Sequence, residues 1–266
     1  MQLISLFLLC IPFVGYWSGD SNQKMGNNKF LICYGRLNPL EVKGYDVLIL
    51  EPEHYTESEI LILRNNNNIV AGYISLTEVN NNSKHFDLLS DYIFGKNSTW
   101  NSSYIDIKKE SAQEILQNLT DDIIDKGFNG LFMDNLDNVS QWGPLKDAEK
   151  SLVSIISAIK NNSNDIYLIQ NSGFFLNDSL ERITDAILVE SLFSLYDFKT
   201  NEYRFRDKRS LDKMLKRINE TSLNSKKDIL VLEYANTAKM YIKLERQLKK
   251  LELDYFIGKI DLQTIN

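Results

Sequence analysis

The stretch GFNGLFMDNLDN, residues 127–138, decides how the fold is interpreted. Its apolar part, Leu131-Phe132-Met133, has the composition of a strand buried on both faces, and it ends in a cluster of acids and amides at 134–138. Asp and Asn form turns because their short side chains hydrogen-bond nearby backbone. A carboxylate at the end of a buried parallel strand is equally typical of a catalytic site. The rest of the chain has to decide between these two interpretations.

Similar short apolar runs recur along the chain. Val, Ile, Leu and aromatic residues dominate each of them, which is typical of strands in a parallel sheet. With GLFMD at 130–134 they number eight, and the other seven are FLICY (30–34), DVLIL (46–50), NIVAGYI (68–74), IYLIQ (166–170), AILVE (186–190), ILVLEY (229–234) and DYFIG (254–258).

Segments with helical spacing lie between these runs. In 111–127 the apolar residues fall on one helical face, Ser111 with Glu114 resembles a capping box, and Gly127 is placed to end the helix. The same spacing recurs in 146–162, 208–220 and 238–253. Strands that alternate with helices predict an α/β fold with a parallel sheet. Eight strands in 266 residues favour one closed (β/α)8 TIM barrel over an open doubly wound sheet.

The composition excludes several classes of function. The net charge of −6 provides no basic surface for nucleic acid. With only two histidines, a metal site built from several imidazoles is excluded, and we expect no metal. No G-x-G-x-x-G follows an early strand and no G-x-S-x-G is present, so neither a dinucleotide cofactor nor α/β-hydrolase chemistry is expected. We expect no cofactor, and no obligate protein partner is evident.

The N-terminal segment 1–17 is apolar and short for a membrane span. It resembles the apolar region of a secretory signal, although no Lys or Arg precedes it. We therefore expect a secreted or cell-envelope protein, with a single barrel over 18–266; a membrane anchor or an N-terminal piece of the barrel is the alternative. If Cys10 leaves with the signal, Cys33 has no partner for an intrachain disulfide.

Polar side chains gather at or just after the ends of the predicted strands. In a (β/α)8 barrel these ends meet on one face, where the chemistry of such barrels takes place. Each residue taken singly also has a structural interpretation, as a loop charge, a turn or a packed ring. Taken together, they predict a site formed by Tyr34, Glu51, Tyr73, Ser75, Glu78, Asp134, Asn135, Asp137, Asn171, Glu190, Tyr196, Glu233 and Tyr234.

Two carboxylates in this set suit glycoside hydrolysis. Asp134 and Glu190 end the fourth and sixth runs, so one strand separates them and both face the same mouth. One carboxyl group protonates the leaving oxygen, and the other attacks the anomeric carbon or activates water. The sequence is compatible with both the retaining and the inverting spacing. Aromatic faces for sugar stacking could come from Tyr34, Tyr73, Tyr196 and Tyr234.

Several of these blocks, in this order, resemble glycoside-hydrolase family 114, the endo-α-1,4-polygalactosaminidase family. The resemblance covers about residues 30 to 260 and rests on FLICYG, VAGYISLTEV, KGFNGLFMDNLDN, LIQNSGF and ILVESLF. It implies a (β/α)8 barrel without a metal that hydrolyses α-1,4-linked galactosamine polymers by endo action.

The same resemblance implies roles for single residues. Asp134, in the G-F-x-G-x-F-x-D block, would be the nucleophile, and Glu190, in the V-E-S block, the general acid/base. The sugar site would be lined by Tyr34, Gly35, Tyr73, Ser75, Glu78, Asn135, Asp137 and Asn171. Thr77 departs from the family pattern, since relatives usually have Gly before the Glu of the third block. Protonated amines of the substrate would be attracted to Glu51, Glu78, Asp137 and Glu233.

Other functions remain open at this point. A carbohydrate-binding barrel without turnover, a glycosidase of a different polysaccharide, and a lyase or transferase on the same scaffold are each compatible with the pattern. The Asn- and Ser-rich segment 79–110, which holds Trp100 and Tyr104, is long enough for a functional lid or a disordered insertion.

Overall fold

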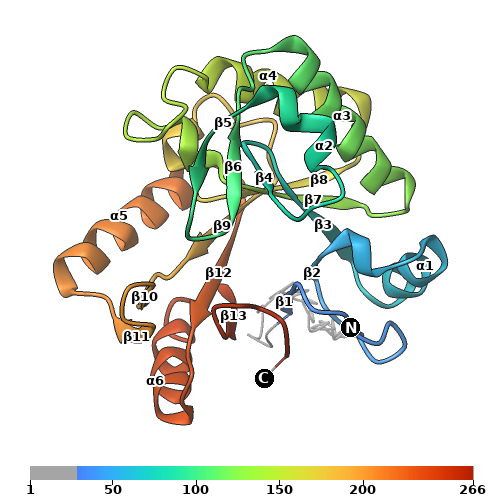
Figure 1. Ribbon diagram of the computed structural model, residues 1–266. Coiled ribbons are helices and arrows are strands. Elements are labelled where there is room, and N and C mark those ends of the chain that lie inside the picture. The colour runs from blue at the N-terminus through green and yellow to red at the C-terminus, as the bar shows by residue number, and fades with distance from the viewer. Residues whose placement is uncertain (1–28, 266) are drawn as a thin grey trace, which may run out of the picture.

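The computed structural model describes residues 29–265, and these fold around an eight-stranded parallel barrel (Figure 1). The predicted (β/α)8 barrel is confirmed, and the open sheet is wrong. The expected N-terminal segment 1–17 lies outside the described residues. The strands, in their order around the barrel, are β1 (Phe30–Cys33), β2 (Val47–Leu50), β3 (Ile69–Ser75), β7 (Gly130–Asp134), β8 (Tyr167–Asn171), β9 (Ala186–Glu190), β12 (Asp228–Tyr234) and β13 (Asp254–Gly258).

The barrel closes between its first and last strands. The backbone N–H groups of Tyr34 and Gly35 both donate to the carbonyl of Leu262, at 2.8 and 3.4 Å, so the chain after β13 is fastened to the end of β1. A Cβ atom on Gly35 would lie 1.9 Å from the carbonyl oxygen of Gln263. Only glycine allows this approach of the two backbones.

Long helices cover the outside of the barrel. The four predicted helical segments are confirmed, and a fifth helix follows β2. Helix α3 begins at Glu110, and its N-cap Lys109 makes no side-chain bond, so the predicted capping box at Ser111 is wrong. Gly127, with φ of 106°, ends this helix as predicted. The helices are α1 (Glu57–Asn66), α3 (Glu110–Asp125), α4 (Glu149–Asn162), α5 (Lys208–Asn224) and α6 (Ala238–Leu248).

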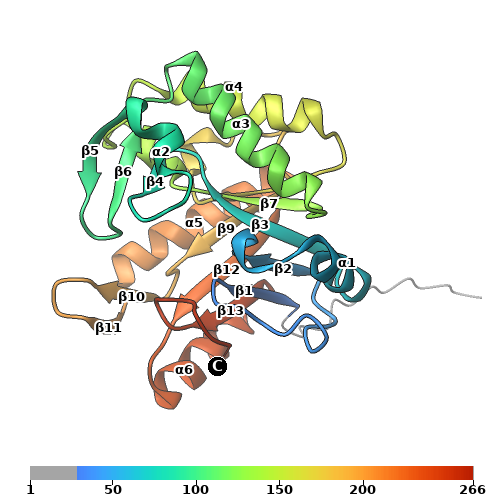
Figure 2. The same cartoon turned by 45° about the vertical axis from the view of Figure 1, so that its right-hand side comes forward.

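Two small sheets stand at the same end of the barrel (Figure 2). The segment expected as a lid or a disordered insertion is ordered: β4 (Glu78–Asn80), β6 (Ser102–Ile105) and β5 (Ile93–Asn97) form an antiparallel sheet, with the short helix α2 (Phe86–Leu89) beside it. The second sheet is the hairpin β10 (Ser194–Asp197) and β11 (Glu202–Phe205), which follows β9. No helix within residues 29–265 is long and apolar enough to cross a membrane.

Side chains alternate between the inside and the outside of the barrel. On β7, Phe132 packs in the barrel interior, whereas Leu131 and Met133 pack against the helices outside. Because side chains along a strand alternate with a period of two, Asp134 must point inward like Phe132. The apolar run and the acid that ends it therefore have different tasks: the run fills the core, and the acid faces the open end of the barrel.

Candidate active site

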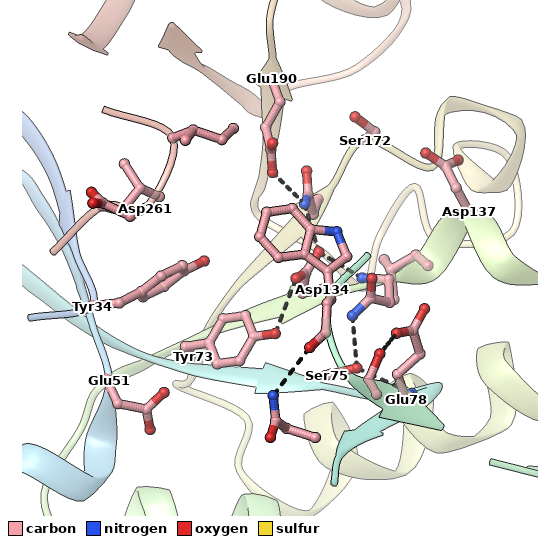
Figure 3. A pocket seen from close by; sticks show the side chains of 18 of the residues that line it. Tyr34, Glu51, Tyr73, Ser75, Glu78, Asp134, Asp137, Ser172, Glu190 and Asp261 are labelled. Atoms are coloured by element: carbon pink, nitrogen blue, oxygen red, sulfur yellow. Dashed lines mark hydrogen bonds between the residues drawn. The ribbon is translucent and has the colours of Figure 1, made fainter. Parts of the chain in front are cut away.

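A cavity of about 720 Å³ opens at the carboxyl ends of the barrel strands (Figure 3). The structure brings eleven of the thirteen residues of the predicted site together in its wall. They are Tyr34, Glu51, Tyr73, Ser75, Glu78, Asp134, Asn135, Asp137, Asn171, Glu190 and Tyr234.

The alternation of side chains explains which strand-end residues reach this cavity. On β8 and β9, Ile169 and Leu188 are interior residues, and the side chains two positions further on are Asn171 and Glu190. On β12 the interior residue Leu232 is followed in the same way by Tyr234. Consecutive strands therefore present their last inward-facing side chain to a common space.

Asn171 joins the two predicted catalytic carboxylates. Its side-chain nitrogen Nδ2 lies 2.6 Å from Oδ1 of Asp134 and 2.7 Å from Oε1 of Glu190. The amide has two N–H groups, so it can donate one to each acid. These two carboxylate oxygens can be no further apart than the sum of the two distances. Figure 3 shows Asp134 and Glu190 in the same pocket.

Hydrogen bonds to Asp134 partly offset the effect of burial on its pKa. Burial raises the pKa of Asp134, and hydrogen bonds from Asn171, from the backbone of Asn135 and from Tyr73 oppose that rise. The backbone N–H of Asn135 lies 2.7 Å from Oδ1, and the Tyr73 hydroxyl lies 3.1 Å from Oδ2. Three donors thus hold one carboxylate in place.

The environment of Glu190 favours its protonated form. Burial, and after it the charge of Asp134, raise the pKa of Glu190 to about 7, against hydrogen bonds from Tyr234 and Asn171. The Tyr234 hydroxyl donates to Oε2 at 2.8 Å. Burial thus raises the pKa of both acids, while their hydrogen-bond donors differ, and such different environments suit neighbouring acids to different roles.

Two further acids stand at the rim of the cavity. Burial raises the pKa of Glu51 to about 7 and also raises that of Asp137, which accepts from the backbone of Gly173. In Figure 3 they lie on opposite sides of Asp134. A bound cation would favour the ionised form of both acids.

Glu78 lines the cavity, but its carboxylate is already engaged. It is almost fully buried and accepts from Asn97 at 3.2 Å, from Asn138 at 2.8 Å and from the hydroxyl of Ser102. These partners come from β5, from β6 and from the segment after β7. Glu78 therefore links the small sheet to the mouth of the barrel. From the sequence, Glu78 was expected to attract amines of the substrate, and this structural role was not predicted.

Two predicted site residues, Glu233 and Tyr196, lie outside the cavity wall. Glu233 shares the outward side of β12 with Val231 and is fully buried, where it accepts from the backbone N–H groups of Phe193 and Ser194 at 2.6 and 2.8 Å. Tyr196 lies in the β10–β11 hairpin, where its hydroxyl bonds Asn201 at 3.1 Å. Contacts with loop segments thus hold both residues outside the cavity wall.

The cavity also contains residues that the strand-end analysis missed. Asp261 follows β13 by three residues, so a search slightly further past each run would have found it. Trp100 lies in the segment whose ordered structure was not anticipated. The missed lining residues are His54, Asn80, Trp100, Ser102, Leu136, Asn138, Ser172, Ile260, Asp261, Leu262 and Gln263.

An aromatic contact spans the mouth. Trp100, in the turn between β5 and β6, meets Phe198, in the turn between β10 and β11, with ring centroids 5.0 Å apart. One hairpin follows β3 and the other follows β9, so the ends of β7 and β8 lie between the strands that carry them. Both rings stay about half exposed, at 50% and 46%, which leaves aromatic surface free for a ligand.

The backbone turns sharply after each of the strands that carry Asp134, Asn171 and Glu190. The next residue is in every case a non-glycine residue with positive φ. This left-handed conformation is disfavoured by roughly 1–2 kcal/mol for most L-residues and less for Asn. Such residues gather at functional sites, where surrounding contacts hold them. They are Asn135 at 61°, Ser172 at 50° and Ser191 at 57°.

A side-chain donor holds the carbonyl of each of these three residues. The donors come from different parts of the chain, and two of them, Thr77 and Gln170, are fully buried. The pairs are Thr77 Oγ1 to Asn135 O at 2.7 Å, Gln170 Nε2 to Ser172 O at 2.8 Å and Arg206 Nη2 to Ser191 O at 2.7 Å. These hydrogen bonds therefore hold the turns that follow Asp134, Asn171 and Glu190.

Thr77 gives a testable case, because it is fully buried and its hydroxyl holds the turn that follows Asp134. Replacing Thr77 by Val removes the donor to a buried carbonyl, so we expect the free energy of unfolding to fall by about 1–3 kcal/mol. We also expect kcat to fall more than KM changes, since the turn that places Asp134 loosens. Denaturant titration and steady-state kinetics measure both. Thr77→Ser keeps the hydroxyl and is the control; equal effects of Val and Ser would contradict this role.

Within residues 29–265, no group of three or more His, Cys, Asp or Glu side chains is arranged to hold a metal ion. The expectation that the chemistry needs no metal remains a prediction. Cys33 is buried as a free thiol, and Cys10 lies outside the described residues.

Comparisons with solved structures agree with the fold. The chain is similar to the glycoside hydrolase domain of PelA from Pseudomonas aeruginosa, with a TM-score of 0.80 and 20% identity over 88% of this chain and 96% of that chain. It is also similar to Ega3 from Aspergillus fumigatus, solved in complex with galactosamine, with a TM-score of 0.71 and 14% identity over 90% and 93%. A more distant similarity, with a TM-score of 0.56 and 11% identity, links it to an α-galactosidase from Thermus thermophilus over 86% of this chain and 57% of that chain.

At the level of sequence, a comparison with curated proteins found no match. A family model, in contrast, matches residues 17–264, which include every element of the barrel and every residue of the cavity wall. The resemblance seen in the separate sequence blocks therefore extends over the whole barrel. The chain belongs to glycoside-hydrolase family GH114.

Proposed function

We propose that the protein hydrolyses polysaccharides that contain α-1,4-linked galactosamine, by endo action and with retention of configuration. Family membership indicates a glycosidase with a carbohydrate substrate. The observation that carries the finer proposal is the single amide nitrogen of Asn171 between the carboxylates of Asp134 and Glu190.

The spacing of the carboxylates supports retention. Oδ1 of Asp134 and Oε1 of Glu190 are separated by no more than two hydrogen-bond lengths, 2.6 and 2.7 Å. Carboxyl groups of retaining enzymes lie roughly 5–5.5 Å apart, whereas inverting enzymes need roughly 6.5–9.5 Å to admit a water. This upper limit for the two oxygens is compatible with the retaining spacing.

The surroundings of the two acids support an assignment of roles. Burial raises the pKa of both acids, but three donors oppose that rise at Asp134, which suits the nucleophile, whereas the pKa of Glu190 is raised to about 7, which suits the acid. Oδ of Asp134 attacks the anomeric carbon while Glu190 gives its proton to the departing glycosidic oxygen. Water then attacks the same carbon, Glu190 takes its proton, and the bond to Asp134 breaks. The new reducing end has the α configuration of the substrate.

The charge of the cavity supports an amino sugar. The wall carries Glu51, Asp137 and Asp261 around the catalytic pair, and within residues 29–265 no lysine or arginine lines it. An ammonium group would be attracted to these carboxylates. Galactosamine is the ligand in the Ega3 structure, which is similar to this chain in fold.

The test is product analysis on α-1,4-linked galactosamine polymer. We expect new reducing ends, oligosaccharides of several lengths by mass spectrometry, and the α anomer as the first product by NMR. The β anomer first would overturn retention, and single residues released from the chain end would overturn endo action. Saturable binding without products would support the carbohydrate-binding alternative, and cleavage of another polysaccharide alone would change the substrate.

Export is part of the same proposal. The apolar segment 1–17 suits a secretory signal, which would bring the protein to a polymer outside the cell. N-terminal sequencing of protein recovered from the culture medium would locate a cleavage site; retention of the whole segment in a membrane fraction would favour an anchor.

A further inference from the structure

A second cavity, of about 890 Å³, adjoins the active site on the side of β7 and β8. We call it the side cavity. Asp137 and Ser172 line both cavities, so the two spaces adjoin at these residues, and Figure 3 shows the two residues together on one side of the catalytic pair. The wall is formed by the segment after β7, the segment after β8 and the face of α5.

The side cavity is negatively charged. Among the described residues of its wall, Arg217 is the single lysine or arginine, against five carboxylates: Asp137, Glu149, Asp178, Glu181 and Glu220. Such an excess favours a cationic ligand. The volume lies in the range of ligand sites, which is roughly 300–1,000 Å³.

Trp142 adds an aromatic surface to this wall. Its side chain is 87% exposed, so the indole contributes little to the core of the protein. The turn that carries it is well fixed: the backbone N–H of Gly143 donates to Ser140 O at 2.8 Å, and that of Leu145 donates to Asn138 O at 2.9 Å. A Cβ on Gly143 would lie 2.0 Å from the carbonyl oxygen of Asn138, so the turn requires this glycine. A rigid turn thus presents a large ring to solvent beside the acids.

A comparable cavity on the other side of the active site lacks this combination. Lys84 and Lys126 are in its wall, and its Glu53 pairs with Lys84 at 3.6 Å and with His85 at 3.2 Å. Basic side chains there already neutralise part of the acidic charge. In the side cavity, one of the five carboxylates, that of Glu220, has an ion pair with a lysine: Lys216 lies 3.6 Å away on the surface of α5.

We infer that the side cavity is a distal subsite, which binds galactosamine units of the polymer beyond the bond that is cleaved. The flat apolar face of the sugar packs on Trp142, and its ammonium group lies among the carboxylates of Glu181 and its neighbours. This inference rests on the proposed function, because the occupant is the same polymer chain that reaches Asp134 and Glu190. It adds a second point of attachment, which raises the effective concentration of the chain at the site.

The test compares substrate lengths. For α-1,4-linked galactosamine oligomers from three to ten units, we expect kcat/KM of the wild type to rise with length. In Trp142→Ala this rise should be about tenfold smaller, with the trimer unaffected. Phe205→Ala, which removes another exposed ring outside both cavities, is the matched control. Glu181→Gln should weaken cleavage of the free-amine polymer and leave the N-acetylated polymer unaffected.

A binding measurement separates this inference from the proposed function. Asp134→Asn and the double variant Asp134→Asn, Trp142→Ala are titrated calorimetrically with the ten-unit oligomer, without turnover. We expect about tenfold weaker binding for the double variant. Equal affinity, or no binding by either, would overturn the distal subsite. Equal loss of activity by Trp142→Ala on all lengths would do so as well, while cleavage by the wild type would leave the proposed function intact.

Discussion

Asp134→Ala is expected to lower kcat on α-1,4-linked galactosamine polymer by about 10⁴-fold or more, the scale seen when a covalent nucleophile is removed. The reason is geometric: Asp134 lies at the barrel mouth, held by Tyr73, Asn135 and Asn171. Among the described carboxylates of the cavity wall, Asp134 alone accepts from all three of these residues. The measurement is steady-state release of reducing ends, with the thermal unfolding midpoint recorded for each variant.

Adding azide to the Asp134→Ala variant tests whether Asp134 acts as the nucleophile. A small anion can enter the space left by the carboxylate and attack the anomeric carbon from the same side. We expect azide to restore part of the activity and to give the β-glycosyl azide, because one displacement inverts the α linkage. An α-glycosyl azide would mean that Asp134 is the acid/base and that the two roles are exchanged. Asp121→Asn, on α3 and outside the cavity, is the control for general effects on folding.

The sequence alone predicted the strands of the barrel and half of the residues that line the cavity. Most strands carry, at or just after their apolar run, a side chain that faces the open end of the barrel, and the (β/α)8 topology brings those ends together. The interior residues Phe132, Ile169 and Leu188 lie two positions before Asp134, Asn171 and Glu190. The alternation of side chains along each strand therefore predicts that these three polar side chains face inward.

The same rule shows why Glu233 was misplaced. Glu233 and Tyr234 both end β12, and only one of two neighbouring side chains can face inward. Leu232 packs inside the barrel, so Tyr234 faces inward and Glu233 faces the helices. If the alternation of side chains along the run ILVLEY had been applied, only Tyr234 would have been assigned to the site. Tyr196 was misplaced for another reason, because nothing in the run AILVE signals the hairpin that follows it.

The sequence alone could not predict contacts between residues that lie far apart along the chain. The bonds from Thr77 to Asn135 and from Arg206 to Ser191 join segments that only the folded barrel brings together. The position of Asn171 between two acids likewise depends on three neighbouring strands having the right register. These contacts decide protonation and orientation, which is why the candidate residues were found more easily than their roles.

Glu190→Ala is expected to lower kcat/KM on the polymer by roughly 10²–10⁴-fold, the usual contribution of a general acid. A sugar hydroxyl is a poor leaving group and needs the proton of Glu190. An aryl α-galactosaminide with an acidic phenol needs none, so its first step should survive the substitution. The second step should then be slow, and intact-mass spectrometry should detect the sugar bound to Asp134. Azide should release it as the α-glycosyl azide. Glu114→Gln, exposed on α3, is the control.

The dependence on pH tests the same assignment independently. Burial and the nearby charge of Asp134 raise the pKa of Glu190 to about 7, so the acid loses its proton as the pH rises through that value. Since the first step requires protonated Glu190, kcat/KM of the wild type should fall above about pH 7. With the aryl substrate, Glu190→Ala should lack this alkaline limb. An unchanged limb in the variant would assign it to another group, of which Glu51, also with a pKa of about 7, is the nearest candidate by its position at the rim.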